Sequence, residues 1–137
     1  MRRSAVFCGI VLFAYACVSR PATVERKGRV VALTDSLLEY GSCDTVRLGR
    51  LHSGEIAVSR LWIANRASRP VVISSFDRSC GCVDFAFEES PLLPGETREF
   101  ILSFDSRGLQ GWQFKNLDLH FSDSSRPLRF FIDVEVK

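Results

Sequence analysis

The chain has 137 residues and a formal net charge of +2, and 46% of its residues are hydrophobic. This length suits one domain with a single hydrophobic core. Removal of the first 16 residues takes away two arginines and no acidic residue, so the remaining 121 residues (137 − 16) have a net charge of 0 (+2 − 2). A neutral chain has no electrostatic reason to bind nucleic acid, and we expect no nucleic-acid partner.

The first residues predict a signal peptide over 1–16. Two arginines precede an uncharged apolar stretch of 12 residues. A stretch of this length is too short to span a bilayer as a mature helix, and a basic start followed by an apolar segment is typical of an export signal. We therefore expect an exported protein.

The residues just before Cys17 predict lipidation. Ala14 and Ala16 stand on either side of Tyr15, so a lipoprotein peptidase would cut here and leave Cys17 as a lipidated first residue. An ordinary signal peptidase also accepts two small residues in this arrangement, which would give a secreted or soluble periplasmic protein. We expect a membrane-anchored lipoprotein that faces the periplasm of the cell envelope.

The segment 17–40 is predicted to be the lipidated N-terminus and a linker, followed by a domain over 41–137. Its part from Arg20 to Arg29 has few apolar residues and a local excess of positive charge, with Arg20, Arg26, Lys27 and Arg29 against Glu25. This composition is typical of a tether with weak contacts to lipid headgroups as a secondary role. Residues 30–40 leave two alternatives, an edge strand or a short helical turn.

The rest of the chain alternates between apolar and polar residues. Phe100, Leu102 and Phe104 share one face of a period-two pattern, which indicates a half-buried strand. Strands are predicted near 45–50, 55–64, 70–76, 82–87, 96–104, 112–121 and 127–136. We therefore expect an all-β fold, an immunoglobulin-like sandwich of about seven antiparallel strands.

Trp62 is the residue that this pattern places least clearly. Both alternating sets of residues 55–64 contain large apolar side chains. If Leu61 and Ile63 point inward, Trp62 lies on the outer face and needs a cover, because an exposed tryptophan is uncommon. Residues 30–40 are the expected cover, and a partner or the membrane is the alternative that makes Trp62 a candidate interaction surface.

Several short motifs together resemble a known bacterial family. They are Gly49-x-Leu51-x-x-Gly54-Glu55, Leu61-x-Ile63-x-Asn65, Pro70-Val71-x-Ile73, Ser79-Cys80-Gly81-Cys82, Pro94-Gly95-Glu96, Phe100-x-Leu102-x-Phe104-Asp105, and Gly111 with Lys115. In this order they resemble the family called domain of unknown function 1573, over about residues 45–137. Val83, Ser122 and the additional Cys43 depart from its pattern.

The resemblance implies an immunoglobulin-like domain, often in a lipoprotein of a Gram-negative envelope, with Leu61 and Ile63 facing inward. It marks Asn65, Gly81, Pro94, Gly95 and Glu96 as signature residues. The chemistry of these residues is that of turns: Pro94 and Gly95 suit a type II turn, and the Asn65 side chain can satisfy backbone groups of a turn. The resemblance implies no activity.

The sequence allows four hypotheses for the chemical state of Cys80 and Cys82. The first is a disulfide between them across Gly81, which as a glycine tolerates unusual backbone angles. The second pairs one of them with Cys43. The third is a soft metal such as Cu(I) held by two thiolates, a candidate cofactor without a recognisable third ligand. The fourth is a pair of buried, inert thiols.

No set of residues indicates an enzyme. His52 and His120 are distant in sequence from the Cys80 motif, so no catalytic base is marked for a cysteine nucleophile. We expect a non-catalytic envelope lipoprotein that serves as a structural or interaction module for an unknown envelope protein or glycan. The alternative is a thiol redox or copper-binding periplasmic protein that acts through Cys80 and Cys82.

Overall fold

The alternating segments of the sequence form strands in this computed structural model, which describes residues 20–137. Within that range the order is β1 (Thr23–Leu33), α1 (Asp35–Tyr40), β2 (Ser42–Leu51), β3 (Ile56–Asn65), β4 (Ile73–Arg78), β5 (Val83–Ala86), β6 (Thr97–Asp105), β7 (Gly111–Phe121) and β8 (Leu128–Val136). All seven predicted strands exist with slightly shifted ends, and β1 is an eighth. The predicted signal peptide and Cys17 lie outside the described residues.

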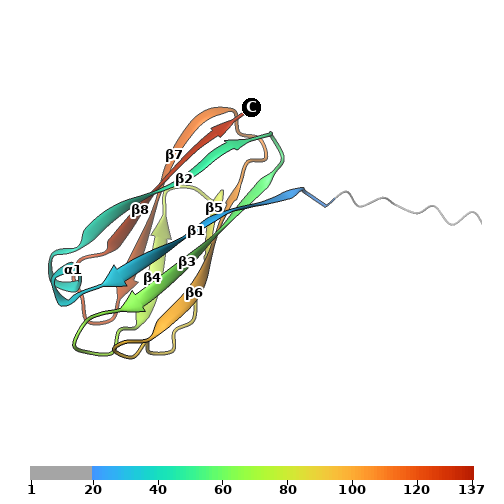
Figure 1. Cartoon of the computed structure of the whole chain (residues 1–137). Coiled ribbons are helices and arrows are strands. Elements are labelled where there is room, and N and C mark those ends of the chain that lie inside the picture. The colour runs from blue at the N-terminus through green and yellow to red at the C-terminus, as the bar shows by residue number, and fades with distance from the viewer. Residues whose placement is uncertain (1–19) are drawn as a thin grey trace, which may run out of the picture.

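The strands form two four-stranded sheets, in the orders β1-β3-β6-β5 and β2-β8-β7-β4. The two sheets pack as two layers (Figure 1), which confirms the predicted sandwich. Side chains that point inward from both sheets fill the core, because successive residues of a strand face opposite sides. The largest of these fully buried side chains include Phe104, Phe130, Leu61, Ile63, Leu117 and Leu119.

Two strand pairs run parallel, so the expected all-antiparallel arrangement is wrong for them. β1 is parallel to β3, and β2 is parallel to β8. Between β1 and β3 the chain passes through β2 in the opposite sheet. Each passage to the other sheet reverses its direction, so the chain returns parallel to its starting strand. Residue alternation shows which face of a strand is buried, but it carries no information about strand direction.

The segment predicted to be a linker contains β1 and α1, and β1 belongs to the sandwich. It pairs with β3 from Thr23 to Leu33, with a shift of register between Arg26 and Arg29, and Val31 and Leu33 are buried in the core. Both alternatives for residues 30–40 therefore occur, one after the other. The alternating pattern did not predict this strand, because its first part contains the charged residues Glu25, Arg26, Lys27 and Arg29, which an edge strand tolerates.

Helix α1 closes one end of the sandwich between β1 and β2 (Figure 1). The Thr34 side chain accepts a hydrogen bond from the Leu37 amide, and Gly41 ends the helix with a φ of 77°. Leu38 is buried in the core. Over residues 20–137 the structure contains no helix with the length and apolar character needed to cross a membrane.

Candidate functional site

Cys80 and Cys82 form a disulfide, with their Cα atoms 5.1 Å apart. Both residues are half-buried, and the Cys82 amide donates a hydrogen bond of 3.1 Å to the Cys80 sulfur. The intervening Gly81 is exposed and is not among the glycines with positive φ, so the tight loop does not use glycine's backbone freedom. The structure thus has the first of the four arrangements that the sequence left open.

Cys43 lies far from this disulfide. It is a free, exposed cysteine in β2, whereas the disulfide follows β4. β2 and β4 are opposite edges of one sheet, with β8 and β7 between them. Three strand spacings separate the two edges by about 14 Å. The second hypothesis, a disulfide from Cys43 to Cys80 or Cys82, is therefore not what the structure contains.

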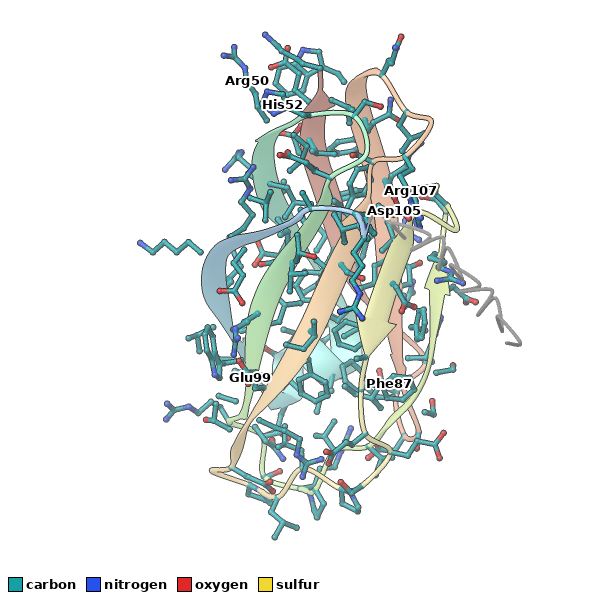
Figure 2. All side chains as sticks on the ribbon, turned by 90° about the vertical axis from the view of Figure 1, so that its right-hand side faces the viewer. Arg50, His52, Phe87, Glu99, Asp105 and Arg107 are labelled. Carbon is teal, nitrogen blue, oxygen red and sulfur yellow. A yellow bond between two sulfur atoms is a disulfide. The ribbon has the colours of Figure 1, made fainter. Side chains whose placement is uncertain are left out.

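The disulfide lies in the segment that carries the chain from one sheet to the other. On its N-terminal side, the Ser79 amide donates to the Asn116 carbonyl of β7 (3.0 Å), and the Asn116 amide donates to Ser79 Oγ (2.9 Å). On its C-terminal side, the Asp105 amide at the end of β6 donates to the Cys82 carbonyl (2.8 Å). Figure 2 shows Asp105 beside Arg107 at this end of β6. The Ser-Cys-Gly-Cys segment is therefore attached to both sheets.

The other signature residues meet near the opposite end of β6. Gly95 has a φ of 83°, and the Glu96 amide donates to the Leu93 carbonyl (2.9 Å), as in a type II turn with Pro94 and Gly95 at its centre. The Gly95 amide donates to the Asn65 carbonyl (2.7 Å), and the Asn65 amide donates to the Glu96 carbonyl (2.8 Å). The turn is thereby joined to the end of β3.

The Asn65 side chain is fully buried and makes three hydrogen bonds. Its Nδ2 donates to the carbonyls of Arg69 (2.9 Å) and Leu92 (2.8 Å), and its Oδ1 accepts from the Ala67 amide (2.9 Å). This amide satisfies turn groups on two separate segments. Asn65 has the predicted role of holding turns, and these contacts leave it no free polar group with which to bind a ligand.

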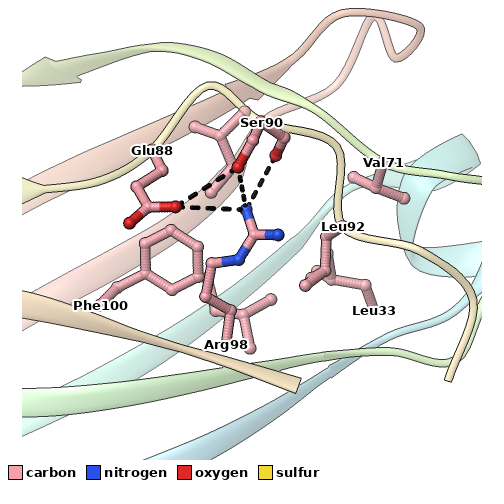
Figure 3. Close-up of a pocket in the computed structure, with 9 residues that line it drawn as sticks. Leu33, Val71, Glu88, Ser90, Leu92, Arg98 and Phe100 are labelled. Carbon is pink, nitrogen blue, oxygen red and sulfur yellow. Dashed lines mark hydrogen bonds and ion pairs between the residues drawn. The ribbon is translucent and has the colours of Figure 1, made fainter. Parts of the chain in front are cut away.

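Glu96 and Arg98 hold the loop before β6. Glu96 Oε2 accepts from the Leu93 amide (2.9 Å), and this bond together with Arg98 lowers the pKa of the Glu96 carboxyl. Arg98 donates to Ser90 and to the Pro91 carbonyl. Figure 3 shows its guanidinium between Ser90 and Glu88, next to a cavity of only about 10 Å³. A cavity of that size holds no more than about one water molecule, so this is a packed end of the core.

Trp62 lies on the outer face, as the inward positions of Leu61 and Ile63 require. The neighbouring strand β1 lies beside it: Val30 is its register partner, and Gly28 lies against its ring. A Cβ built on Gly28 would lie 2.1 Å from Cζ3 of the Trp62 ring. Trp62 is half-buried, and its candidate role as an interaction surface stays a prediction.

A different aromatic surface is exposed on the outer face of the sheet β2-β8-β7-β4. Trp112 and Phe114 in β7 are 71% and 63% exposed, and the Phe114 ring stacks on half-buried Phe131 of β8 with centroids 5.2 Å apart. We call these three residues the aromatic surface. The sequence prediction missed it, although period-two alternation that places Leu117 and Leu119 inward also places Trp112 and Phe114 outward.

A buried acidic residue lies on the same outer face. Asp118 of β7 accepts two hydrogen bonds, of 2.7 and 2.5 Å, from Arg129 of β8. Arg129 holds the pKa of the Asp118 carboxyl below its usual range, despite the burial that opposes ionisation. Arg129 is also the β8 residue opposite Cys43. Asp118 is therefore neutralised by a structural ion pair.

Among residues 20–137, no group of three or more histidine, cysteine, aspartate or glutamate side chains has the arrangement of a metal site. The disulfide form of Cys80 and Cys82 has no thiolate to offer a soft metal, and Cys43 is too distant to serve as a third ligand. A copper site would require reduction of this bond and a further ligand.

The family described as "Protein of unknown function (DUF1573)" matches residues 42–136. The chain belongs to this family. No curated protein matches the sequence. In this DUF1573 member the cysteine motif lies at the crossover between the sheets, and Asn65, Gly95 and Glu96 form the bonded turn at the opposite end of β6.

Solved structures similar to this DUF1573 domain share its fold at low sequence identity. A protein of unknown function from Porphyromonas gingivalis W83 has a TM-score of 0.57 at 16% identity, over 66% of this chain and 43% of that chain. PapD-like domain 7 of human CEP192 has a TM-score of 0.52 at 14% identity, over 68% of this chain and 80% of that one. The VesB protease of Vibrio cholerae has a TM-score of 0.54 at 12% identity, over 66% of this chain and 30% of the VesB chain.

These similarities show an immunoglobulin-like, PapD-like sandwich. The matched region is less than half of the Porphyromonas gingivalis protein and less than a third of VesB, so it corresponds to one part of each. At 16% identity or less, they transfer the fold alone to the DUF1573 chain.

Proposed function

We propose that this protein is a non-catalytic module that binds a partner protein in the cell envelope and is held at the membrane by a lipid on Cys17. The aromatic surface is the observation that carries this proposal. Trp112 and Phe114 are large and exposed, and Trp and other aromatic residues are enriched where proteins bind one another. Scattered single hydrophobic residues need no such explanation, but three aromatic side chains on one sheet face, two of them stacked, do.

The surroundings of the aromatic surface favour a protein partner. By register, Trp112 lies opposite Glu135 and Phe114 opposite Asp133. On the far side of β8, Arg50 and Arg47 lie opposite the same two acidic residues. An apolar centre beside charged groups of both signs is the usual composition of a protein interface with a polar rim. A glycan that stacks on Trp112 is the competing ligand.

A photo-crosslinking experiment in living cells tests this proposal. A photoreactive phenylalanine analogue replaces Phe114 in the full chain, and the same analogue replaces Tyr40, an exposed aromatic residue in α1, as the matched control. We expect one defined protein adduct from position 114, none from position 40, and loss of the adduct in a Trp112→Ala background.

The crosslinked partner is then purified and titrated with the full chain. Trp112→Ala is expected to weaken binding by at least about 30-fold, the effect of a central interface residue. Tyr40→Ala should leave the affinity unchanged. Equal adducts from both positions, or binding of envelope glycan fragments that requires Trp112 while no protein adduct forms, would show that the proposal is wrong.

The second candidate, thiol exchange at Cys80 and Cys82, rests on the hydrogen bond from the Cys82 amide to the Cys80 sulfur. In the reduced form, the same N–H would stabilise a thiolate at Cys80. Exchange with an external dithiol would reduce this disulfide and oxidise that dithiol. Equilibration with glutathione tests it, and copper titration of the reduced chain tests Cu(I) binding; a Cys80→Ser/Cys82→Ser variant should abolish either signal without unfolding.

A further inference from the structure

The sandwich is closed in different ways along its two long sides. On the β4 and β5 side the core is filled by aromatic rings, with Phe76 and Phe85 centroids 6.1 Å apart. On the β1 and β2 side, arginines of β1 reach across to β2. Arg26 Nη2 donates to the Arg50 carbonyl (2.5 Å), and Arg29 donates to Asp44 Oδ1 (2.6 Å) and to the Thr45 carbonyl (3.2 Å).

A hollow of about 290 Å³ opens between these two arginine contacts. Its lining includes Lys27, Arg29, Thr45, Val46, Arg47 and Ser59. The register between β1 and β3 shifts between Arg26 and Arg29, where β1 has one residue more than β3. Such a bulge bends an edge strand away from its partner, which accounts for the opening at this point.

Two buried polar atoms beside this hollow have no hydrogen-bond partner. They are Ser59 Oγ and Arg26 Nε. Ser59 is only 1% exposed, lines the hollow, and is the register partner of Arg26 on the neighbouring strand. A buried hydroxyl or guanidinium N–H without a partner is costly, and few are retained in native proteins without a reason. Of the two, Ser59 belongs to the lining of the hollow, so its hydroxyl is the donor that a ligand there would meet.

The residues that line the hollow include three cations, Lys27, Arg29 and Arg47, and no carboxylate. Arg29 forms an ion pair with Asp44, and Arg50 forms one with Glu135. Within the described residues, Arg26, Lys27 and Arg47 have no ion-pair partner, so three unpaired cations lie at one edge of the sandwich. Water could fill the hollow, but water would leave this charge uncompensated, whereas an anion would neutralise it.

We propose that this hollow binds a phosphate group. A phosphate oxygen accepts a hydrogen bond from Ser59 Oγ, and Lys27 and Arg47, which also line the hollow, neutralise its charge. Lys27 and Arg29 are exposed, so their flexible side chains can move aside to admit the ligand. A soluble phosphate ester and the phosphate of a lipid headgroup share this chemistry, and the test separates them.

The first measurement is calorimetric titration of the full chain, purified in detergent, with inorganic phosphate at constant ionic strength. We expect saturable binding that weakens about tenfold in Ser59→Ala and in Arg47→Gln, since a hydrogen bond to a charged group is lost or a counter-charge is removed. Arg66→Gln is the matched control, because Arg66 is an exposed cation in the loop after β3 that forms no ion pair within residues 20–137.

The second measurement is co-sedimentation of the Cys17→Ala full chain with vesicles of phosphatidylglycerol or of phosphatidylcholine. Binding of inorganic phosphate without vesicle binding identifies a soluble phosphate ligand. Binding to phosphatidylglycerol vesicles that Ser59→Ala and Arg47→Gln both abolish identifies a lipid headgroup. If neither ligand binds, if Ser59→Ala binds as well as the wild type, or if Arg66→Gln weakens binding as much as Arg47→Gln, the hollow is filled by water only and the proposal is overturned.

Discussion

The ring of Trp62 lies against the backbone of Gly28, closer than any side chain on residue 28 would allow. A Cβ at this position would be 2.1 Å from Cζ3 and 2.8 Å from Cη2 of the ring, and 2.9 Å from the Arg60 carbonyl oxygen. This contact covers an outward-facing tryptophan with a neighbouring strand of the same sheet. It also explains why glycine occupies the bulge of β1.

Gly28→Ala should therefore destabilise the sandwich by about 2 kcal/mol, the typical effect of forcing a methyl group into a packed site. Urea unfolding monitored by tryptophan fluorescence measures the change, and the emission should shift as the ring is displaced. Gly81→Ala is the matched control, because nothing lies within 4 Å of a Cβ there and its φ is not positive. Equal stability of Gly28→Ala and Gly81→Ala would contradict the contact.

Asn65→Ala should cost about 3 kcal/mol, because it leaves buried backbone groups of two segments without partners. Asn65→Asp should be destabilising at neutral pH as well, since a carboxylate would face the Arg69 and Leu92 carbonyls that the amide now satisfies. Its stability should recover in part as the pH falls and the new carboxyl becomes protonated. Chemical unfolding of both variants at pH 7 and pH 4 measures this, and an Asn65→Asp variant as stable as the wild type at pH 7 would show that the amide donates no hydrogen bond.

The Asp118 and Arg129 pair should make stability fall in acid. The folded-state pKa of Asp118 is lowered, so its contribution is fully present above the unfolded-state pKa of about 3.9 and is lost as the pH falls through the lower folded-state value. Asp118→Asn should lower the free energy of unfolding at pH 7 by about 1 kcal/mol, and the difference from the wild type should disappear toward pH 2.

Arg129→Gln removes the cause of this pKa shift. The difference in free energy of unfolding between this variant and the wild type should therefore also be present at pH 7 and shrink toward pH 2. The double variant should lose less than the sum of the two single losses, because both act on one interaction. Additive losses in a full set of unfolding curves between pH 2 and pH 7 would mean that the two side chains do not interact in solution.

Thiol labelling should find Cys43 reactive, and Cys80 and Cys82 protected by their disulfide. In the chain with its signal removed and Cys17 lipidated, native labelling should modify one thiol, and labelling after reduction and unfolding should modify three, Cys43, Cys80 and Cys82. Cys80→Ser/Cys82→Ser should lose only about 1–2 kcal/mol of stability, because the disulfide closes a very short loop. More than one native thiol would contradict the disulfide.

Lipidation of Cys17 predicts that Cys17→Ala releases the protein from the membrane fraction. Cell fractionation followed by immunoblotting measures the distribution of the full chain. The Cys43→Ala variant is the control for loss of a cysteine, and it should stay in the membrane fraction. Membrane retention of Cys17→Ala would show that another feature anchors the protein.

Some features could be predicted because they depend on neighbours in sequence. The spacing of Phe100, Leu102 and Phe104 alone predicts a half-buried strand. Pro94-Gly95 predicts a turn, because proline fixes its own φ and glycine allows a positive φ. β1 was harder to predict, since Arg26, Lys27 and Arg29 are unusual in a strand and acquire their role only through contacts with β2. The aromatic surface was also missed, because exposure of Trp112 depends on whether another segment covers it.

The sequence by itself determined the all-β class, the positions of most strands and turns, the inward set that contains Leu61 and Ile63, and the family. These follow from local backbone preferences and from the period of two that a strand imposes. Only the tertiary structure decided that β1 and β2 run parallel to their partners and that Gly28 lies against Trp62. It also decided that Cys80 forms a disulfide with Cys82 and not with Cys43, and that Ser59 Oγ beside the hollow has no hydrogen-bond partner. Each of these depends on which strands become neighbours, and that is settled by packing two sheets against each other.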